Sequence, residues 1–167
     1  MNAATALDVA AVRTLLEAVR DPEIPVLTID DLGVLRDVRV ADDGVVTVAI
    51  TPTYSGCPAM QTIADDIRAT LAGAGVETVH IETRLAPAWT TDWLSAAGRR
   101  KLLEIGIAPP AVASSDKRVL HGAAVAVACP RCHSQHTELV SEFGSTACKA
   151  LYRCRSCLEP FDYFKCL

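Results

Sequence analysis

The chain lacks the features of a membrane, secreted or nucleic-acid-binding protein. No apolar stretch approaches the ~20 residues needed to cross a bilayer. Residues 1–11 do not show the basic start and apolar run of a secretory signal. Basic runs are missing too, and the net charge of the 167 residues is −4. These absences predict a cytoplasmic protein that binds neither membrane nor nucleic acid.

Cysteine, in contrast, is abundant, with seven residues in the chain. Without a secretory signal, this number favours metal binding in a reducing compartment over disulfides. Four of the cysteines form two Cys-x-x-Cys pairs, at Cys129 and Cys132 and at Cys154 and Cys157. Each spacing lets two thiolates face one ion from a tight turn, and two such turns supply the four sulfurs of a structural zinc site. The sequence therefore predicts these four cysteines as zinc ligands.

The tail holds more sulfur than one zinc ion requires. Cys148 and Cys166 are either small buried residues or additional metal or cluster ligands. Because iron–sulfur clusters also use four cysteine thiolates, a cluster in the tail is the alternative to zinc. His133 and His136 lie beside the first pair. Surface positions are expected for both histidines, with a Cys₃His zinc site as the alternative.

Hydrophobic periodicity predicts an α+β domain followed by a β-rich zinc-ribbon-like module. The expected order is helix, two-strand hairpin, helix, strand, helix and then the tail. We expect the domain over residues 1–107, a linker over 108–118 and the four-cysteine module over 119–167. The expected elements are a helix over 5–20, strands over 34–40, 46–50 and 79–85, helices over 58–72 and 89–105, and a first strand of the module over 119–128.

Cys57 is the one cysteine outside the tail, and it directly precedes Pro58 at the expected start of a helix. A thiol at a helix N-cap has a lowered pKa, and its thiolate can bind metal or attack as a nucleophile. The alternative is a buried cysteine without chemistry. The nearest candidates to support a Cys57 site are Thr53, Ser55, Glu23 and Asp30, whereas Asp21 and Asp31 are expected to act in turns.

Three motifs in the first part of the chain carry a family resemblance. They are Asp21-Pro22-Glu23-Ile24-Pro25, Asp31-Leu32-Gly33-Val34 and Thr51-Pro52-Thr53-Tyr54-Ser55-Gly56-Cys57-Pro58. Over about residues 7–107 the chain resembles the SufT-like family of metal–sulfur cluster assembly proteins. In that family the cysteine at the position of Cys57 is the functional one, so the resemblance implies that Cys57 is a transient metal or cluster ligand.

The tail resembles that of the PaaD (PaaJ) family, which is encoded with the phenylacetyl-CoA ring epoxidase. The matching segments are Phe143-Gly144-Ser145-Thr146-Ala147-Cys148-Lys149 and Glu159-Pro160-Phe161-Asp162-Tyr163-Phe164-Lys165-Cys166. The resemblance implies an accessory protein rather than an enzyme. The sequence has neither the paired Glu-x-x-His helices of a di-iron site nor a Rossmann glycine fingerprint.

The combined resemblance implies delivery of iron or an iron–sulfur cluster to the epoxidase. The expected clients are its iron–sulfur flavin reductase or its di-iron subunit, and a homodimer is possible. Two alternatives stay open at this point. In the first, the chain is a non-catalytic structural subunit of the epoxidase complex. In the second, it is a small iron–sulfur electron-transfer protein.

Overall fold

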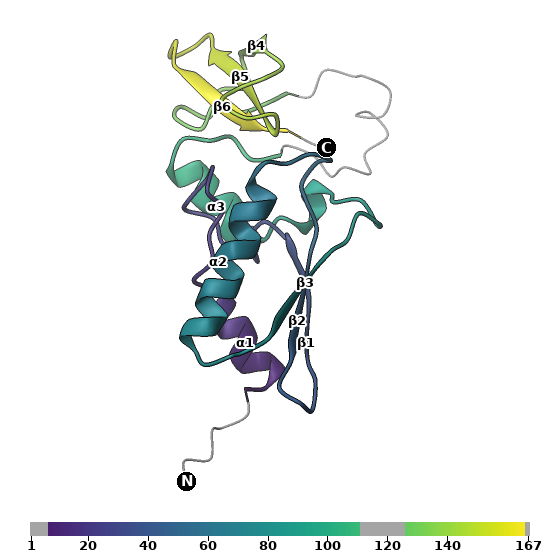
Figure 1. Cartoon of the computed structure of the whole chain (residues 1–167). Coiled ribbons are helices and arrows are strands. Elements are labelled where there is room, and N and C mark those ends of the chain that lie inside the picture. Colours follow the sequence, from purple (N-terminus) through teal and green to yellow (C-terminus); the bar gives the residue numbers. More distant parts are fainter. Residues whose placement is uncertain (1–6, 111–125, 166–167) are drawn as a thin grey trace. The chain divides into compact units, whose positions relative to one another are not determined.

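A computed structural model describes residues 7–110 and 126–165 (Figure 1). The chain divides into two compact units, Met1–Trp89 and Thr90–Leu167. Each unit combines helical segments with a three-stranded sheet, so the predicted α+β class is confirmed. No helix in the described part of the chain is long and apolar enough to span a membrane.

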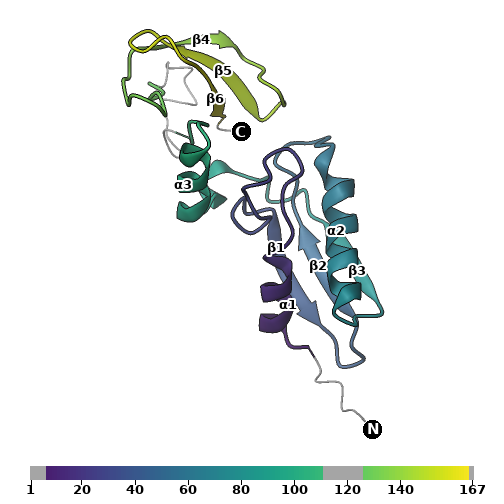
Figure 2. The ribbon, with the colours of Figure 1, turned by 90° about the vertical axis from the view of Figure 1, so that its left-hand side faces the viewer.

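The first unit is a three-stranded sheet with two helices on one face. Strand β1 (Leu35–Val40) pairs antiparallel with β2 (Val46–Ile50), which pairs parallel with β3 (Val79–Thr83). The predicted hairpin is therefore confirmed, and Gly44 in its turn has φ +82°. Helices α1 (Val9–Leu16) and α2 (Ala59–Gly73) cover the same face of the sheet (Figures 1 and 2).

Helix α1 is shorter than the predicted range of 5–20. It is capped by Asp8, whose Oδ1 accepts the N–H of Ala11 at 2.8 Å. After Leu16 the chain leaves the helix, because Val19 and Asp21 form backbone hydrogen bonds with Ile29 and Leu27. This short bridged loop replaces the last turn of the predicted helix.

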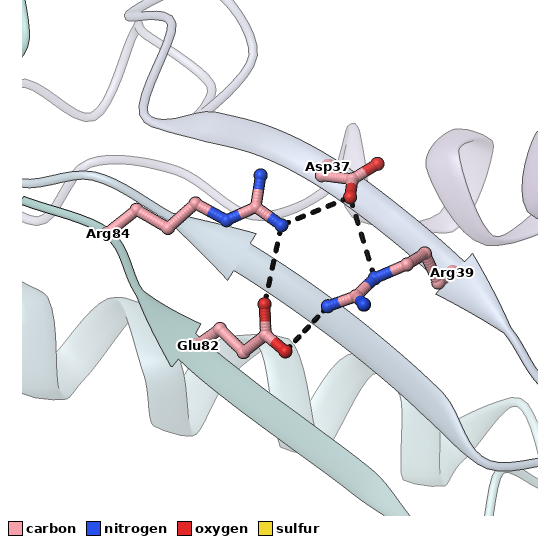
Figure 3. A network of polar contacts seen from close by, with 4 residues as sticks. All are labelled: Asp37, Arg39, Glu82 and Arg84. Atoms are coloured by element: carbon pink, nitrogen blue, oxygen red, sulfur yellow. Dashed lines mark hydrogen bonds and ion pairs between the residues drawn. The ribbon is translucent and has the colours of Figure 1, made fainter. Parts of the chain in front are cut away.

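The open face of the sheet carries a closed ring of ion pairs (Figure 3). Nη2 of Arg84 lies 3.2 Å from Asp37 and 3.3 Å from Glu82, and Nε of Arg39 lies 3.5 Å from Asp37. Arg39 also contacts Glu82 and completes the ring. Ala49 lies between Asp37 and Glu82 in the strand register and is only 1% exposed. The ring thus covers this face with charges that neutralise one another.

The second unit joins a short helix to an antiparallel sheet. It contains η1 (Thr91–Trp93), α3 (Ala96–Glu104) and strands β4 (Thr137–Ser141), β5 (Lys149–Cys154) and β6 (Pro160–Phe164) in the order β4-β5-β6. The single helix predicted over 89–105 is therefore wrong in its first part. Ser95 interrupts it, because its side chain accepts the N–H of Gly98 and starts α3 as an N-cap.

The segment after α3 joins the sheet of the second unit. The N–H of Ala108 donates to Asp162 O at 2.8 Å, and the N–H of Phe164 donates to Ala108 O at 2.9 Å. By its contacts the chain divides after Trp89. Ala108, which was predicted as the first linker residue, is buried with the tail.

The strand predicted over 119–128 lies mostly outside the described residues, and 126–128 are not a strand. The predicted domain bounds stay a prediction.

The tail has a small core built from the inner face of its sheet. Tyr152 stacks on Phe161 with ring centroids 6.0 Å apart and meets the edge of Tyr163 at 5.5 Å. Phe143 is instead 65% exposed, with the Lys165 ammonium 4.6 Å from its ring centroid. The buried core consists of Ala108, Val127, Cys129, Ala150, Cys154, Phe161 and Tyr163.

Both Cys-x-x-Cys turns end in the same backbone conformation. The residue after the second cysteine has positive φ in each turn, +61° at His133 and +66° at Leu158. This left-handed conformation crowds the Cβ of any residue other than glycine. The two turns are therefore alike in backbone geometry although their sequences differ.

We expect Glu82→Gln to destabilise the first unit at pH 7 but not at pH 3. The Arg39 and Arg84 guanidiniums beside Glu82 lower the pKa of its carboxyl below the ordinary 4.5. A lowered pKa in the folded state adds stability above the ordinary value, and this stability is lost as the pH falls through the folded value. Urea unfolding followed by tryptophan fluorescence measures the difference. Glu17→Gln, an exposed position outside the ring, is the control, and an equal effect there would contradict the prediction.

We expect Leu158→Gly to stabilise the second unit by about 0.5–1 kcal/mol, because glycine adopts φ > 0 without strain. Leu158 is 61% exposed, so the substitution removes little packing. The matched control is Leu139→Gly, a 49% exposed strand position where glycine should destabilise. Thermal unfolding of the two variants would show opposite shifts. If both variants shift the unfolding temperature in the same direction, the positive φ of Leu158 is not a source of strain.

Candidate functional site

The structure brings the four paired cysteines of the tail together. The sulfur atoms of Cys129, Cys132, Cys154 and Cys157 all lie within 4.8 Å of one another. Cys129 Sγ is 3.7 Å from Cys157 Sγ, and Cys132 Sγ is 3.5 Å from Cys154 Sγ. Four sulfurs at about 2.3 Å from a tetrahedral zinc ion would be about 3.8 Å apart. The four sulfurs are therefore close to the arrangement that one zinc-sized ion needs.

Backbone hydrogen bonds prepare the second turn for metal binding. The N–H groups of Cys157 and Ser156 donate to Cys154 Sγ at 3.5 and 3.4 Å. These bonds, together with the side chains of Cys132 and Cys157, lower the pKa of Cys154 to about 6, which favours the thiolate that a metal needs. The turns are also linked across the site, since the hydroxyl oxygens of Ser134 and Ser156 are 2.8 Å apart.

Half of this four-sulfur group is buried. Cys129 and Cys154 are 0% exposed and belong to the core of the tail, whereas Cys132 and Cys157 are exposed. Nearby basic residues pair with carboxylates instead of clustering on the sulfurs. Arg131 pairs with Glu159, Arg155 lies 2.6 Å from Glu138, and buried Lys149 lies 3.7 Å from Asp162.

The remaining candidates of the tail lie apart from the four sulfurs. His133 and His136 are exposed, as expected for surface residues. Cys148 is 5% exposed, its sulfur 3.0 Å from the Thr146 hydroxyl, and it is not part of the four-sulfur group. Cys166 lies outside the described residues. The group that the structure assembles is thus one of four cysteines and no histidine, among the residues described.

Cys57 lies one residue before the position predicted from the sequence. Pro58 is the N-cap of α2, so Cys57 precedes the cap. Its thiol is half-buried and contacts the N–H of Ala59 and the hydroxyl of Thr53. The predicted lowering of its pKa is wrong. Burial raises the pKa of the Cys57 thiol, and this effect exceeds the opposite effects of Ala59 and Thr53.

Two acidic residues from the first motif approach Cys57. The charges of Glu23 and Asp21 add to the rise in the pKa of the Cys57 thiol. Asp21 Oδ1 also accepts the N–H groups of Glu23 at 2.9 Å and Ile24 at 2.7 Å, which confirms its predicted role in a turn. This turn holds the backbone that carries Glu23. The sequence favoured a role in a turn for Asp21, and the structure adds to it an electrostatic effect on the Cys57 thiol.

The other residues proposed to support Cys57 are placed differently. Asp30 is exposed, and its carboxylate lies 3.9 Å from Arg13 of α1. Asp31 accepts the N–H of Thr28 at 3.1 Å, and its own N–H donates to the Thr28 hydroxyl at 3.0 Å. Ser55 is exposed on the loop before Cys57. Of the residues near Cys57 in sequence or motif, Thr53 thus contacts the thiol, and Glu23 and Asp21 act on it through their charges.

Comparisons with known proteins match the two parts of the chain separately. Residues 9–81 match the family model described as an iron–sulfur cluster assembly protein, and residues 113–165 match the PaaD zinc beta ribbon domain. An Fe–S protein maturation auxiliary factor of Porphyromonas gingivalis is 40% identical over 55% of this chain and 85% of its own length. The crystal structure of a domain of unknown function from Bacillus anthracis matches with a TM-score of 0.53 and 26% identity, over 56% of this chain and 89% of that one.

We expect the purified chain to hold about one metal ion, and Cys132→Ser to lose it, because a structural site needs all four thiolates. Chelation should unfold β4–β6 and leave α1, α2 and β1–β3 folded, as metal binding and folding are coupled in small ribbons. Metal analysis and ¹H–¹⁵N NMR spectra provide the readouts. The control is Cys148→Ala, which changes a cysteine outside the four-sulfur group. Equal metal loss in that variant would contradict the assignment.

One relative matches both parts of the chain together. It is a protein of Escherichia coli strain K12 whose name describes it as a putative 1,2-phenylacetyl-CoA epoxidase component. This relative is 53% identical over 153 residues, which cover 92% of this chain and 90% of that protein. Together with the matching ribbon, this similarity confirms the resemblance of the tail. The chain belongs to the PaaD family, together with this Escherichia coli protein.

Proposed function

We propose that this protein is a non-catalytic accessory factor that assembles or delivers iron or an iron–sulfur cluster to a phenylacetyl-CoA epoxidase. The expected client is the iron–sulfur flavin reductase or the di-iron subunit. The observation that carries the proposal is the half-buried Cys57 thiol beside Glu23 and Asp21, within residues 9–81 that match an iron–sulfur cluster assembly protein. The name of the similar Escherichia coli protein supports the epoxidase as the system served.

The surroundings of Cys57 suit a temporary ligand. Its raised pKa keeps the thiol protonated when no metal is bound, so binding of the cargo must release a proton. One cysteine also supplies only one of the four thiolates that a cluster commonly uses. The remaining ligands would come from a client or a small molecule, since Cys57, Glu23 and Asp21 are not among the described residues whose ligand atoms lie close enough to share one ion. Cargo held through so few protein ligands can pass on to a client.

The four-sulfur group has the opposite character, and we propose that it is a structural zinc site. Four thiolates complete the coordination of the ion and leave no open position for cargo or substrate. Mutual sulfur distances within 4.8 Å suit one ion. A cluster would distribute the same cysteines over several iron atoms, which places their sulfurs further apart. The geometry therefore favours a scaffold over a redox cluster, which was the basis of the electron-transfer alternative.

We expect Cys57→Ala to lower the iron and sulfide content of the co-expressed epoxidase components severalfold while the variant itself keeps its fold and zinc. Glu23→Gln should lower it less, since Cys57 remains. The matched control is Ser55→Ala, an exposed residue of the same loop. The readouts are iron and sulfide per reductase, and circular dichroism of each variant.

The same experiment separates the alternatives. Full client metallation with Cys57→Ala, together with co-purification at fixed stoichiometry, would overturn the delivery role and favour a structural role in the complex. A coloured chain with a reversible redox signal would favour an electron-transfer protein. Metal analysis of the chain purified without oxygen would detect that case directly.

A further inference from the structure

The first unit has a groove at the end opposite Cys57. It has a volume of about 760 Å³ and is formed by the start of α1, the β1–β2 turn and the loop from α2 to β3. Figure 1 shows these three segments together at the lower end of the unit. All residues of the groove belong to the first unit. Its lining consists of Leu7–Val9, Val40–Val46 and Ala74–Thr78.

Apolar side chains form much of this lining. Val46 is 1% and Val76 8% exposed, so they lie at its base, whereas Val9 is 40% exposed at its edge. Leu7 and Val40 are partly buried beside them. An apolar depression of this size can accept one or two aliphatic side chains of a partner.

The charges around the groove have one sign. Its acidic residues are Asp8, Asp42, Asp43 and Glu77, all of them exposed. Among the described residues that line the groove there is no lysine, arginine or histidine. Asp8 caps α1, and Asp43 Oδ1 accepts the N–H of Val45 at 3.1 Å, but neither contact removes the negative charge of the carboxylate.

The end of α2 adds to this negative potential. Residues Ala74–Thr78 of the groove directly follow the C-terminus of α2, where the helix dipole is negative. The last turn of α2, which is described in full, contains no basic residue to compensate it. The β1–β2–β3 face behaves differently, since Arg39 and Arg84 there neutralise both carboxylates. The groove is thus a negatively charged site with an apolar base.

We propose that this groove docks a basic peptide segment of a partner protein, with lysine or arginine residues flanking one or two aliphatic side chains. Opposite charges would meet at the rim while the aliphatic side chains enter the base. Helix α2 has 15 residues, so its two ends are roughly 22 Å apart at 1.5 Å per residue. A partner bound at the groove would therefore leave Cys57 accessible.

The test is an NMR titration of the ¹⁵N-labelled full chain with the peptide Lys-Leu-Lys-Lys-Leu-Lys. We expect shifts at Val40–Val46 and Ala74–Thr78. The double variant Asp42→Asn with Glu77→Gln should bind about tenfold more weakly, and the loss should shrink at high salt. The matched control, Glu17→Gln with Asp66→Asn, removes two exposed acidic residues outside the groove and should bind normally.

Two more variants test separate points. One tests the apolar contribution to peptide binding, and the other tests whether peptide binding is independent of the proposed function. Val9→Ser should weaken binding without changing any charge. Cys57→Ala should bind the peptide like the wild type, because the docking does not depend on cysteine chemistry. If Cys57→Ala loses client metallation but still binds the peptide, delivery by Cys57 and docking at the groove are independent properties.

Several outcomes would overturn the docking proposal. They include equal binding of the Glu-Leu-Glu-Glu-Leu-Glu peptide, an equal loss in the control variant, and shifts confined to residues outside the groove. Peptide binding that appears only after residues 1–6 are deleted would also overturn the proposal. In that case the groove would be occupied by the chain's own N-terminal residues and not by a partner.

Discussion

The second unit depends on the close approach of four cysteine sulfur atoms. Its tail, with three short strands and a few aromatic rings, buries little surface by itself, and metal binding can supply free energy that stabilises it. Cys129 and Cys154 connect the site to the core, because both are fully buried among Ala150, Phe161 and Tyr163. The positive φ of His133 and Leu158 is a conformational cost that this arrangement must offset.

The chain thus contains two kinds of cysteine site with different surroundings. The four tail sulfurs are close to one another and form a complete ligand set. Among the described residues that act on Cys57 there is no second sulfur, and burial raises the pKa of its thiol, which favours the protonated form. A complete ligand set retains its ion, whereas a protonated thiol beside carboxylates binds metal only in competition with protons. This contrast in ligand number and protonation is the physical basis for proposing a structural role for one site and a transfer role for the other.

The sequence predicted what depends on local spacing. The Cys-x-x-Cys pairs and the hairpin of strands over 34–40 and 46–50 are local patterns, and the structure has both. It did not predict what depends on tertiary contacts. Burial of Cys57 reverses the effect expected from a helix end. Ala108 joins the sheet of the tail although its sequence surroundings resemble a linker. Trp89 donates its indole N–H to Leu32 O at 2.8 Å, a contact without a local signal.

The surfaces of the first unit differ in whether their charges are paired. On the open sheet face, two arginines and two carboxylates satisfy one another, so a partner would have to break existing ion pairs to bind there. At the groove, carboxylates and a helix C-terminus share one sign. No basic residue occurs among the described residues of the lining, so a cationic partner gains charge pairs there. Pairing of charges therefore favours the groove over the open face as the proposed docking surface, and this surface lies at the end of α2 opposite Cys57, the proposed cargo site.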